Sequence, residues 1–145
     1  MFTASARSIG GTLRHEIDVN GRHTIVTDEP ESLGGTDAGP APHELMASML
    51  AACTSTMIVL FAQRREWPLD DVRVDVRYDA DVTPRRAEIS VHLPEGLTPD
   101  QVERLRRVAI TCPARRALEA GFIFDEQIEL DLPAAENAGL EALAR

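Results

Sequence analysis

An uncharged stretch in the first half of the chain constrains the fold more than any other feature. Between Leu45 and Ala62 there is no acidic or basic residue, and apolar side chains recur at helical spacing in two registers. This pattern predicts a helix that is buried on almost every side, and therefore the central helix of the core. The small residues Ala47, Ala51 and Ser55 recur four apart, so another helix can approach that face closely.

The same stretch is long enough to raise the question of a membrane. About 18 apolar residues are the lower limit for a helix that crosses a bilayer. Ser and Thr residues interrupt the stretch, however, and Pro40 and Pro42 precede it. The flanking segments also have the alternation of ordinary strands. We therefore interpret it as the core helix of a soluble protein.

The segments before the helix predict an antiparallel hairpin and then a long loop. Alternating apolar residues over 12–19 meet Asn20–Gly21 and resume beyond it, and Asn-Gly is a strong hairpin signal because both residues accept a positive φ. Residues 1–10 predict a weak strand or a loose arm. Residues 28–42 are rich in glycine, proline and acidic side chains and predict a surface loop that leads into the helix.

Two further strands are predicted after the helix. Apolar and charged residues alternate without a break over 72–79, and the alternation returns over 87–93 after a turn at 83–86. Each strand then has one buried and one solvated face, as in an antiparallel pair that covers a core.

The last third of the chain predicts a second helical region and a final strand. Thr98, Pro99 and Gln101 combine an N-cap, a proline at the first helical position and a capping-box partner, so a helix begins there. Pro113 kinks or restarts it and Gly121 ends it. The buried stripe of this helix is predicted to be Val102, Leu105, Ala109 and Cys112. Apolar residues of one parity over 122–132 predict a last strand, and residues 133–145 predict a loosely attached helical tail.

These elements predict an α+β fold in which antiparallel sheets pack on two central helices, within a single domain of residues 1–145. An uncharged helix about 27 Å long is difficult to cover in so small a unit. A homodimer that buries it from both sides is the expected solution.

Charge and cysteine content limit the classes of function. The formal net charge is −9, from 24 acidic and 15 basic residues, which disfavours nucleic acid and anionic membrane surfaces as partners. The sequence has no signal-peptide pattern, so a cytoplasmic location is expected. Two cysteines in a cytoplasmic chain are more often free, catalytic or redox-active than a structural disulfide.

The surroundings of the two cysteines differ. Cys112 directly precedes Pro113, where a helical turn would begin, so a helix N-terminus together with Arg115 and Arg116 should lower its pKa. The alternative is a small buried residue at a helix kink. Cys53 lies in the middle of the apolar helix, where burial alone would raise its pKa. Without a cationic or basic partner from elsewhere, this thiol would be inert.

The remaining polar candidates open the uncharged helix. His43 and Glu44 lie in its first turn, where the Glu44 carboxylate complements the positive end of the helix dipole. That structural role competes with a catalytic one. The spacing of His15, His23, His43 and His92 matches no metal site, and the glycines of 34–39 do not form a phosphate-binding loop. Neither a metal nor another cofactor is expected.

Three segments together resemble a known family. They are GGTDAGPAPHELMASMLAACTSTM, the following WPLDDVRVDVRY and the later ITCPARRAL. With these segments the chain resembles the OsmC/Ohr family of osmotically induced and organic-hydroperoxide-resistance proteins over residues 12–130. The resemblance implies an OsmC-like intertwined homodimer with the two cysteines on long central helices. It also implies reduction of organic hydroperoxides, in which one thiolate attacks the peroxide and the other Cys forms a disulfide that a dithiol reduces.

By position, the resemblance makes Cys53 the attacking thiol and Cys112 the resolving one. The residues themselves favour Cys112 as the more acidic thiol, so the two arguments agree on the pair and differ on the roles. In peroxidase members of the family, an Arg from the N-terminal strands activates the first thiolate and is held by a Glu after the helix-opening Pro. Here His43 occupies that position and Glu44 follows it, and the candidates for the Arg are Arg7, Arg14 and Arg22, of which Arg22 is preferred.

Two functions of different classes remain. The first is a cysteine-based peroxidase of organic hydroperoxides that uses a Cys53/Cys112 thiol–disulfide cycle. The second is a non-catalytic dimer that binds a hydrophobic small molecule at the subunit interface, in which the cysteines serve only packing.

Overall fold

The N-terminal residues form a three-stranded antiparallel sheet. The computed structural model describes residues 1–129, and its first sheet has the order β1 (Ala4–Ser8), β2 (His15–Val19), β3 (His23–Thr27). The predicted hairpin is confirmed, because Asn20 and Gly21 have φ values of 56° and 65° in the turn between β2 and β3. The alternative of a loose N-terminal arm is wrong, since β1 pairs with β2 along its whole length.

The loop after β3 is held by a buried carboxylate. Asp28 is only 2% exposed, and its Oδ2 accepts hydrogen bonds from Thr36 Oγ1 at 2.6 Å, Thr36 N at 2.9 Å and Ala38 N at 3.2 Å. Its Oδ1 accepts from Glu29 N at 2.9 Å. A Cβ at Gly35 would collide with the carbonyl of Glu29, so only glycine fits there. The loop, which contains a short 3-10 helix at Glu31–Leu33, is therefore fixed and delivers the chain to α1 at a defined point.

We expect the Asp28→Asn variant to loosen this loop and to lose the acid sensitivity that Asp28 provides. The Thr36 hydroxyl and the backbone amides lower the pKa of Asp28 from 3.8 to about 2, so its contribution to stability is present near neutral pH and lost as the pH falls from about 4 towards 2. An Asn side chain would turn N–H donors towards amides that also donate. The measurements are hydrogen exchange at the Thr36 and Ala38 amides and thermal unfolding as a function of pH.

The neighbouring Asp37→Asn variant is the matched control, because the Asp37 side chain is exposed. Equal exchange rates at Thr36 and Ala38 in the wild type and in Asp28→Asn would contradict the role of Asp28.

The uncharged stretch forms the long helix α1 (Pro42–Gln63), as predicted, but a single chain does not bury it. Its buried residues are Leu50, Thr54, Ile58 and Ala62, one stripe spaced by four residues. Most of the remaining apolar positions are half-buried or exposed, so the expectation of a helix covered on almost every side is wrong for the isolated chain. The reason is that α1 packs against β4, α2 and α3, whereas the N-terminal sheet makes its main contacts within itself.

The second sheet and the second helical region agree with most of their predictions. Strands β4 (Arg73–Asp79) and β5 (Arg86–His92) form an antiparallel pair. Helix α2 (Pro99–Ala109) begins at its predicted N-cap, where Thr98 Oγ1 accepts from Gln101 N at 3.3 Å. Pro113 restarts the chain as a separate helix, α3 (Pro113–Ala120).

Two details of this region differ from the predictions. Val102 on α2 is 42% exposed, so it does not belong to the buried stripe, whereas Leu105 does. Cys112 is not on α2 but is the N-cap residue of α3, which places its side chain at a helix N-terminus.

The predicted last strand is wrong within the described residues. Residues 121–129 are not in a strand, because neither sheet of residues 1–129 offers them an edge with which they pair. Phe122, Ile123, Phe124 and Ile128 consequently all lie exposed. Residues 130–132 of that predicted strand and the predicted tail of 133–145 lie outside the described residues.

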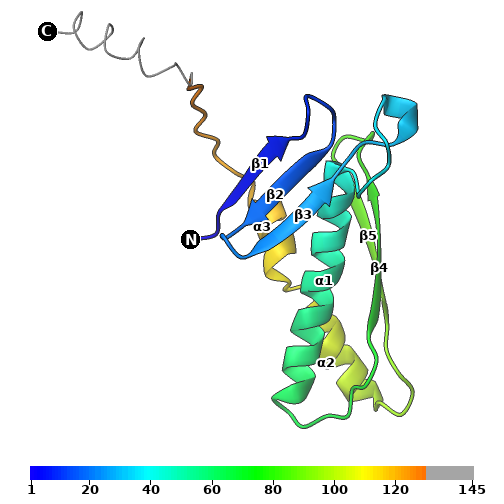
Figure 1. The fold of residues 1–145 in the computed structure, drawn as a ribbon. Coiled ribbons are helices and arrows are strands. Elements are labelled where there is room, and N and C mark those ends of the chain that lie inside the picture. Colours follow the sequence, from blue (N-terminus) through cyan, green and yellow to red (C-terminus); the bar gives the residue numbers. More distant parts are fainter. Residues whose placement is uncertain (130–145) are drawn as a thin grey trace, which may run out of the picture.

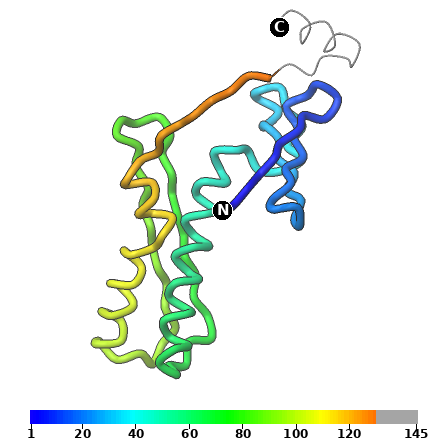
Figure 2. The backbone as a smooth tube through the Cα atoms, turned by 90° about the vertical axis from the view of Figure 1, so that its left-hand side faces the viewer, coloured from blue at the N-terminus to red at the C-terminus, as the bar shows by residue number. Residues whose placement is uncertain are grey.

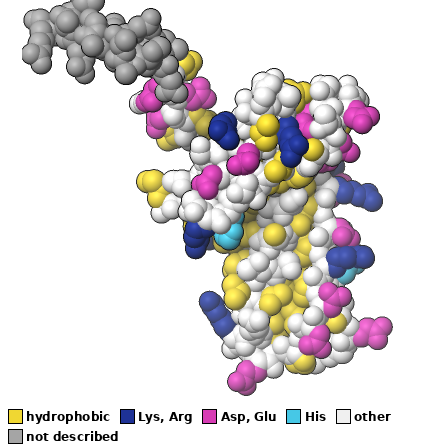
Figure 3. Space-filling view, viewed as in Figure 1, with side chains coloured by type: hydrophobic (Ala, Val, Ile, Leu, Met, Phe, Trp, Pro, Cys, Tyr) yellow, Lys and Arg dark blue, Asp and Glu magenta, His cyan; other side chains and the backbone are white. Residues whose placement is uncertain are grey.

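The elements are arranged around α1. The β4–β5 pair runs along one side of this helix, and α2 and α3 lie behind it (Figures 1 and 2). The N-terminal sheet sits at one end and stands apart from this body in the turned view (Figure 2). Below that sheet, hydrophobic side chains show along the length of the body on the surface facing the viewer (Figure 3). The fold is thus α+β with antiparallel sheets, and it leaves part of its central helix uncovered.

Candidate functional site

The two thiols meet where α3 begins against the middle of α1. Cys53 lies on α1 and is partly exposed, whereas Cys112 is fully buried at the N-cap of α3. Both are free, and their sulfur atoms lie close enough to affect each other's ionisation. The structure therefore brings together two cysteines that are 59 positions apart in the sequence.

Cys112 is the more acidic thiol of the pair. Burial on its own would raise its pKa, but the backbone amide of Arg115, the Cys53 thiol, the Thr54 hydroxyl and the amide of Ala114 together lower the pKa below the ordinary value of 9.0. The first amides of a helix have no partner within the helix, so they are free to donate to an anion at the N-cap. The direction agrees with the prediction for a helix N-terminus, but the guanidinium groups of Arg115 and Arg116, which were also expected to lower this pKa, are not among the causes within the described residues.

Cys53 has the opposite tendency. Burial raises its pKa above 9.0, and the neighbouring Cys112 raises it further, because a Cys53 thiol can donate its proton to a Cys112 thiolate. The Ala114 amide lowers the pKa of Cys53, so that single backbone donor acts on both sulfurs. No arginine or histidine is among the groups that shift Cys53 within the described chain. Cys112 is therefore the thiol that ionises more readily, and Cys53 is the one that keeps its proton more strongly.

The other predicted site residues lie away from the thiols in the single chain. Glu44 is used as a cap, since its Oε2 accepts from Ala41 N at 2.9 Å at the start of α1. Nine residues separate it from Cys53, about 14 Å along the helix. His43 is exposed, with its ring 6.4 Å from that of Tyr78. Arg22 lies exposed in the turn between β2 and β3. The catalytic roles of these three residues stay predictions.

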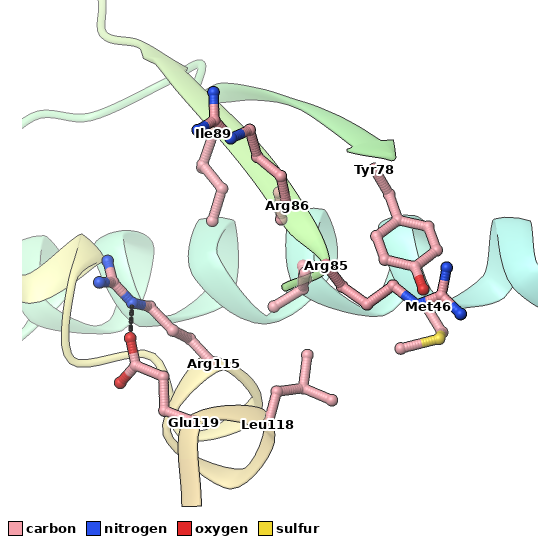
Figure 4. Close-up of a pocket in the computed structure, with 10 residues that line it drawn as sticks. Met46, Tyr78, Arg85, Arg86, Ile89, Arg115, Leu118 and Glu119 are labelled. Carbon is pink, nitrogen blue, oxygen red and sulfur yellow. Dashed lines mark hydrogen bonds and ion pairs between the residues drawn. The ribbon is translucent and has the colours of Figure 1, made fainter. Parts of the chain in front are cut away.

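A cavity of about 570 Å³ lies between α1, the β4–β5 pair and α3. Its apolar walls are formed by side chains from four elements (Figure 4): Met46 and Leu50 of α1, Tyr78 of β4, Ile89 of β5 and Leu118 of α3. Neither cysteine lines it, but two of its lining residues, Leu50 and Arg115, are each three positions from a cysteine, about one helical turn. The cavity is open enough for a small apolar molecule to reach this region.

Three arginines line the same cavity: Arg85, Arg86 and Arg115. Arg115 is paired with Glu119, whose Oε1 lies 2.7 Å from its Nε, as the dashed line in Figure 4 marks. Arg86 is the first residue of β5 and Arg85 directly precedes it, and neither forms an ion pair among the described residues. The sequence did not predict this cavity, because the pattern of residues 83–86 indicates only a turn between two strands. In residues 1–129, no three His, Cys, Asp or Glu side chains are grouped as metal ligands.

Comparisons with known proteins agree on the fold. A crystal structure of an osmotic stress induced and detoxification response protein from Psychrobacter arcticus is 25% identical, covers 80% of this chain and 87% of its own, and gives a TM-score of 0.68. The organic hydroperoxide resistance protein OsmC from Legionella pneumophila is also 25% identical, with 81% and 88% coverage and a TM-score of 0.59. An organic hydroperoxide resistance protein from Vibrio cholerae, 20% identical, gives a TM-score of 0.60 over 80% and 83% of the two chains, and captopril is bound in one of its active sites.

Among curated proteins, no sequence matches this chain. The family profile described as OsmC-like protein matches residues 35–126, which include α1, both cysteines, the β4–β5 pair and the helices behind α1. The match covers more than half of the chain, and the matched residues form the helices and strands that position the two cysteines. The chain belongs to the OsmC-like family.

Proposed function

We propose that the protein is a thiol-dependent peroxidase that reduces organic hydroperoxides. The observation that carries this proposal is the meeting of Cys53 and Cys112, one partly exposed and the other with a lowered pKa. An apolar cavity between α1, the β4–β5 pair and α3 adds to it. Thiol peroxidases need a thiol that the peroxide can reach and a second thiol that can close a disulfide. Organic hydroperoxide resistance proteins among the similar structures support the same chemistry.

The proposed cycle starts at Cys53, because that sulfur is the accessible one. Cys53 transfers its proton to the Cys112 thiolate and attacks the peroxide oxygen, the O–O bond breaks, and the alcohol leaves with the proton returned from Cys112. The product is a sulfenic acid on Cys53. The Cys112 thiolate then attacks that sulfur and releases hydroxide as the disulfide forms. An external dithiol, as the cytoplasm would supply, returns two electrons and restores both thiols.

The apolar cavity would hold the organic part of the substrate. Its apolar walls suit an alkyl or aryl group. Arg85 and Arg86, which also line it, would bind a carboxylate by donating hydrogen bonds to it. This arrangement favours hydroperoxides with a hydrophobic body over hydrogen peroxide.

We further propose that the working form is a homodimer. The face of α1 that one chain leaves uncovered is apolar and uncharged, and exposed apolar residues follow α3 as well. By length and composition α1 could also cross a membrane. A second copy that covers it accounts equally for its apolarity, and the soluble character of the flanking strands favours that explanation.

The second candidate function is the binding of a hydrophobic small molecule without catalysis. The cavity is the observation that favours it, because the cavity exists whether or not the thiols react. This function predicts that Cys53→Ser and Cys112→Ser variants keep both ligand affinity and stability, within about 1 kcal/mol.

The decisive experiment is turnover by the purified protein. We expect it to consume cumene hydroperoxide with a dithiol reductant, and its free-thiol content to fall from two per chain to none after oxidant alone. If no hydroperoxide is consumed and the thiol content stays at two, the peroxidase proposal fails. Extraction of a bound lipid from such a protein would then support the binding function.

A further inference from the structure

A second cavity lies next to the first one and shares two residues with it. Its volume is about 370 Å³, and it lies between β5 and α2. Ile89 of β5 and Arg115 of α3 line both cavities. Apart from Arg106, the other residues that line the second cavity are apolar: Val91, Leu93, Val102, Leu105, Ala109 and Ile110. The two cavities therefore follow one another along the same strand.

Strand β5 and the residue after it form one wall of both cavities. Ala87 and Ile89 line the first cavity, and Ile89, Val91 and Leu93 line the second. These residues are two positions apart, so they lie on one face of the strand. From Ala87 to Leu93 this apolar face is about 20 Å long, since a strand rises about 3.3 Å per residue. The wall is thus long, narrow and without charge.

The helices do not close the space beside this wall. The main packing partners of α1 are β4, α2 and α3, whereas that of β5 is β4. Ile89 and Leu118 point into the first cavity from opposite sides (Figure 4). Val102 and Ile110, which line the second cavity, are 42% and 54% exposed. Exposed apolar residues that gather in one groove are typical of a binding site.

Carboxylates balance the arginines in the middle and at the α2 end of this groove. Arg115 is paired with Glu119, at 2.7 Å. Arg106 lies 4.0 Å from a carboxylate oxygen of Glu103. Neither position is therefore the preferred place for the negative charge of a ligand.

An arginine without such a partner lies at the opposite end, next to the β4–β5 turn. Arg85 forms no ion pair within residues 1–129. Its side chain extends towards Tyr78 and Met46, whereas that of Arg86 runs in the other direction (Figure 4). Arg86 is also opposite Asp79 in the register of the sheet. Arg85 is therefore the group best placed to bind an anion at this end of the groove.

We propose that the two cavities form one channel for a long, unbranched apolar chain that ends in a single carboxylate. The carboxylate binds Arg85, and the chain runs along β5 past Ile89 into the second cavity. One leaflet of the hydrocarbon core of a bilayer is about 15 Å thick, half of about 30 Å, so the acyl chain of a lipid fits the length of the wall.

Only the catalytic consequence of this channel rests on the proposed function. Arg115 lines both cavities and is three positions after Cys112, about one helical turn. A chain that occupies the channel therefore passes near the start of α3. Hydroperoxides of such chains would then be preferred over short neutral ones.

The first test is the affinity of the full-length protein for three ligands, measured by isothermal titration calorimetry below their micelle concentrations. The ligands are octanoate, tetradecanoate and tetradecan-1-ol. We expect tetradecanoate to bind at least about tenfold more tightly than octanoate, because only the longer chain reaches the apolar second cavity. Tetradecan-1-ol should bind more weakly than tetradecanoate, since it has no charge for Arg85.

Two variants test the second cavity. Ala109→Phe fills it and should bind tetradecanoate no better than octanoate. Val102→Asn makes its wall polar and should reduce the advantage of tetradecanoate; as an exposed position it tolerates the change if Ala109→Phe does not fold. Val82→Asn is the matched control, because Val82 is 39% exposed and lines neither cavity. It should bind as the wild type does.

Arg85→Gln tests the charged end. It should weaken the binding of both carboxylates by about fivefold and leave that of tetradecan-1-ol unchanged. Arg77→Gln is its control, since Arg77 is exposed on β4 and lines neither cavity. This control should keep the wild-type affinities.

Equal affinity of the wild type for octanoate and tetradecanoate, or no binding of either, would overturn the proposal. So would equal effects of Val102→Asn and Val82→Asn, or of Arg85→Gln and Arg77→Gln. No binding together with a halved mass of Val102→Asn in light scattering would assign the groove to a second copy of the chain instead.

The same measurements separate this channel from the peroxidase proposal. A protein that consumes cumene hydroperoxide but binds no tetradecanoate would overturn the channel and leave the peroxidase standing. A protein without turnover that binds tetradecanoate, with the expected losses in Arg85→Gln and Val102→Asn, would support the channel and contradict the peroxidase.

Discussion

Replacing either cysteine with serine is expected to reduce steady-state hydroperoxide turnover by at least about 100-fold, in two different ways. In Cys53→Ser the accessible nucleophile is gone, so no hydroperoxide should be consumed. In Cys112→Ser the first thiol remains, so at most one equivalent per chain should react before the cycle stops for lack of a resolving thiol. Rapid mixing with substoichiometric and excess cumene hydroperoxide measures the two cases separately.

The chemical states of the variants give a second readout. Oxidised Cys112→Ser should carry a sulfenic acid on Cys53 that dimedone traps, and oxidised wild type should carry an internal disulfide and no dimedone adduct. The double variant should be no less active than Cys53→Ser, because residues that act as one unit are not additive. Wild-type turnover in both single variants would contradict the cycle, and a sulfenic acid on Cys112 in Cys53→Ser would reverse the proposed roles.

Local sequence signals were sufficient for most of the elements. The Asn20–Gly21 turn, the alternation over 72–79 and the N-cap at Thr98 each act within a few residues, so the corresponding structures form as predicted. The acidity of Cys112 was predictable for the same reason. A proline directly after a cysteine marks a helix start, and a helix start presents free amides.

Features that depend on packing between distant segments were not predictable from local patterns. In the sequence Thr54 is one of the polar residues that interrupt the uncharged stretch, and only the packing of other elements against α1 shows that its side chain is fully buried. The alternation over 122–132 suits a strand, but a strand needs a neighbouring edge, and the described part of the chain pairs none with residues 121–129. The extent to which α1 is covered depends in the same way on what packs against it.

The Ala52→Glu variant is expected to convert the protein from a dimer into a monomer. Ala52 is exposed on α1 between Met49 and Leu60, which are 42% and 41% exposed, so a glutamate would remain in water in a single chain. In a dimer that covers this face, the same carboxylate would be buried without a partner, at a cost of several kcal/mol. Light scattering should give twice the chain mass for the wild type and one chain mass for the variant.

Gln63→Glu is the control for this change, because it adds the same charge at an exposed position at the end of α1. It should remain dimeric. A monomeric wild type would contradict the dimer, and an unchanged mass in Ala52→Glu would place the interface elsewhere. The variant also separates assembly from chemistry, since Cys53 and Cys112 meet within one chain. In a monomeric Ala52→Glu protein the pKa of Cys112 should therefore still be lowered by the start of α3, and any loss of turnover would be due to groups that the second copy brings to the site.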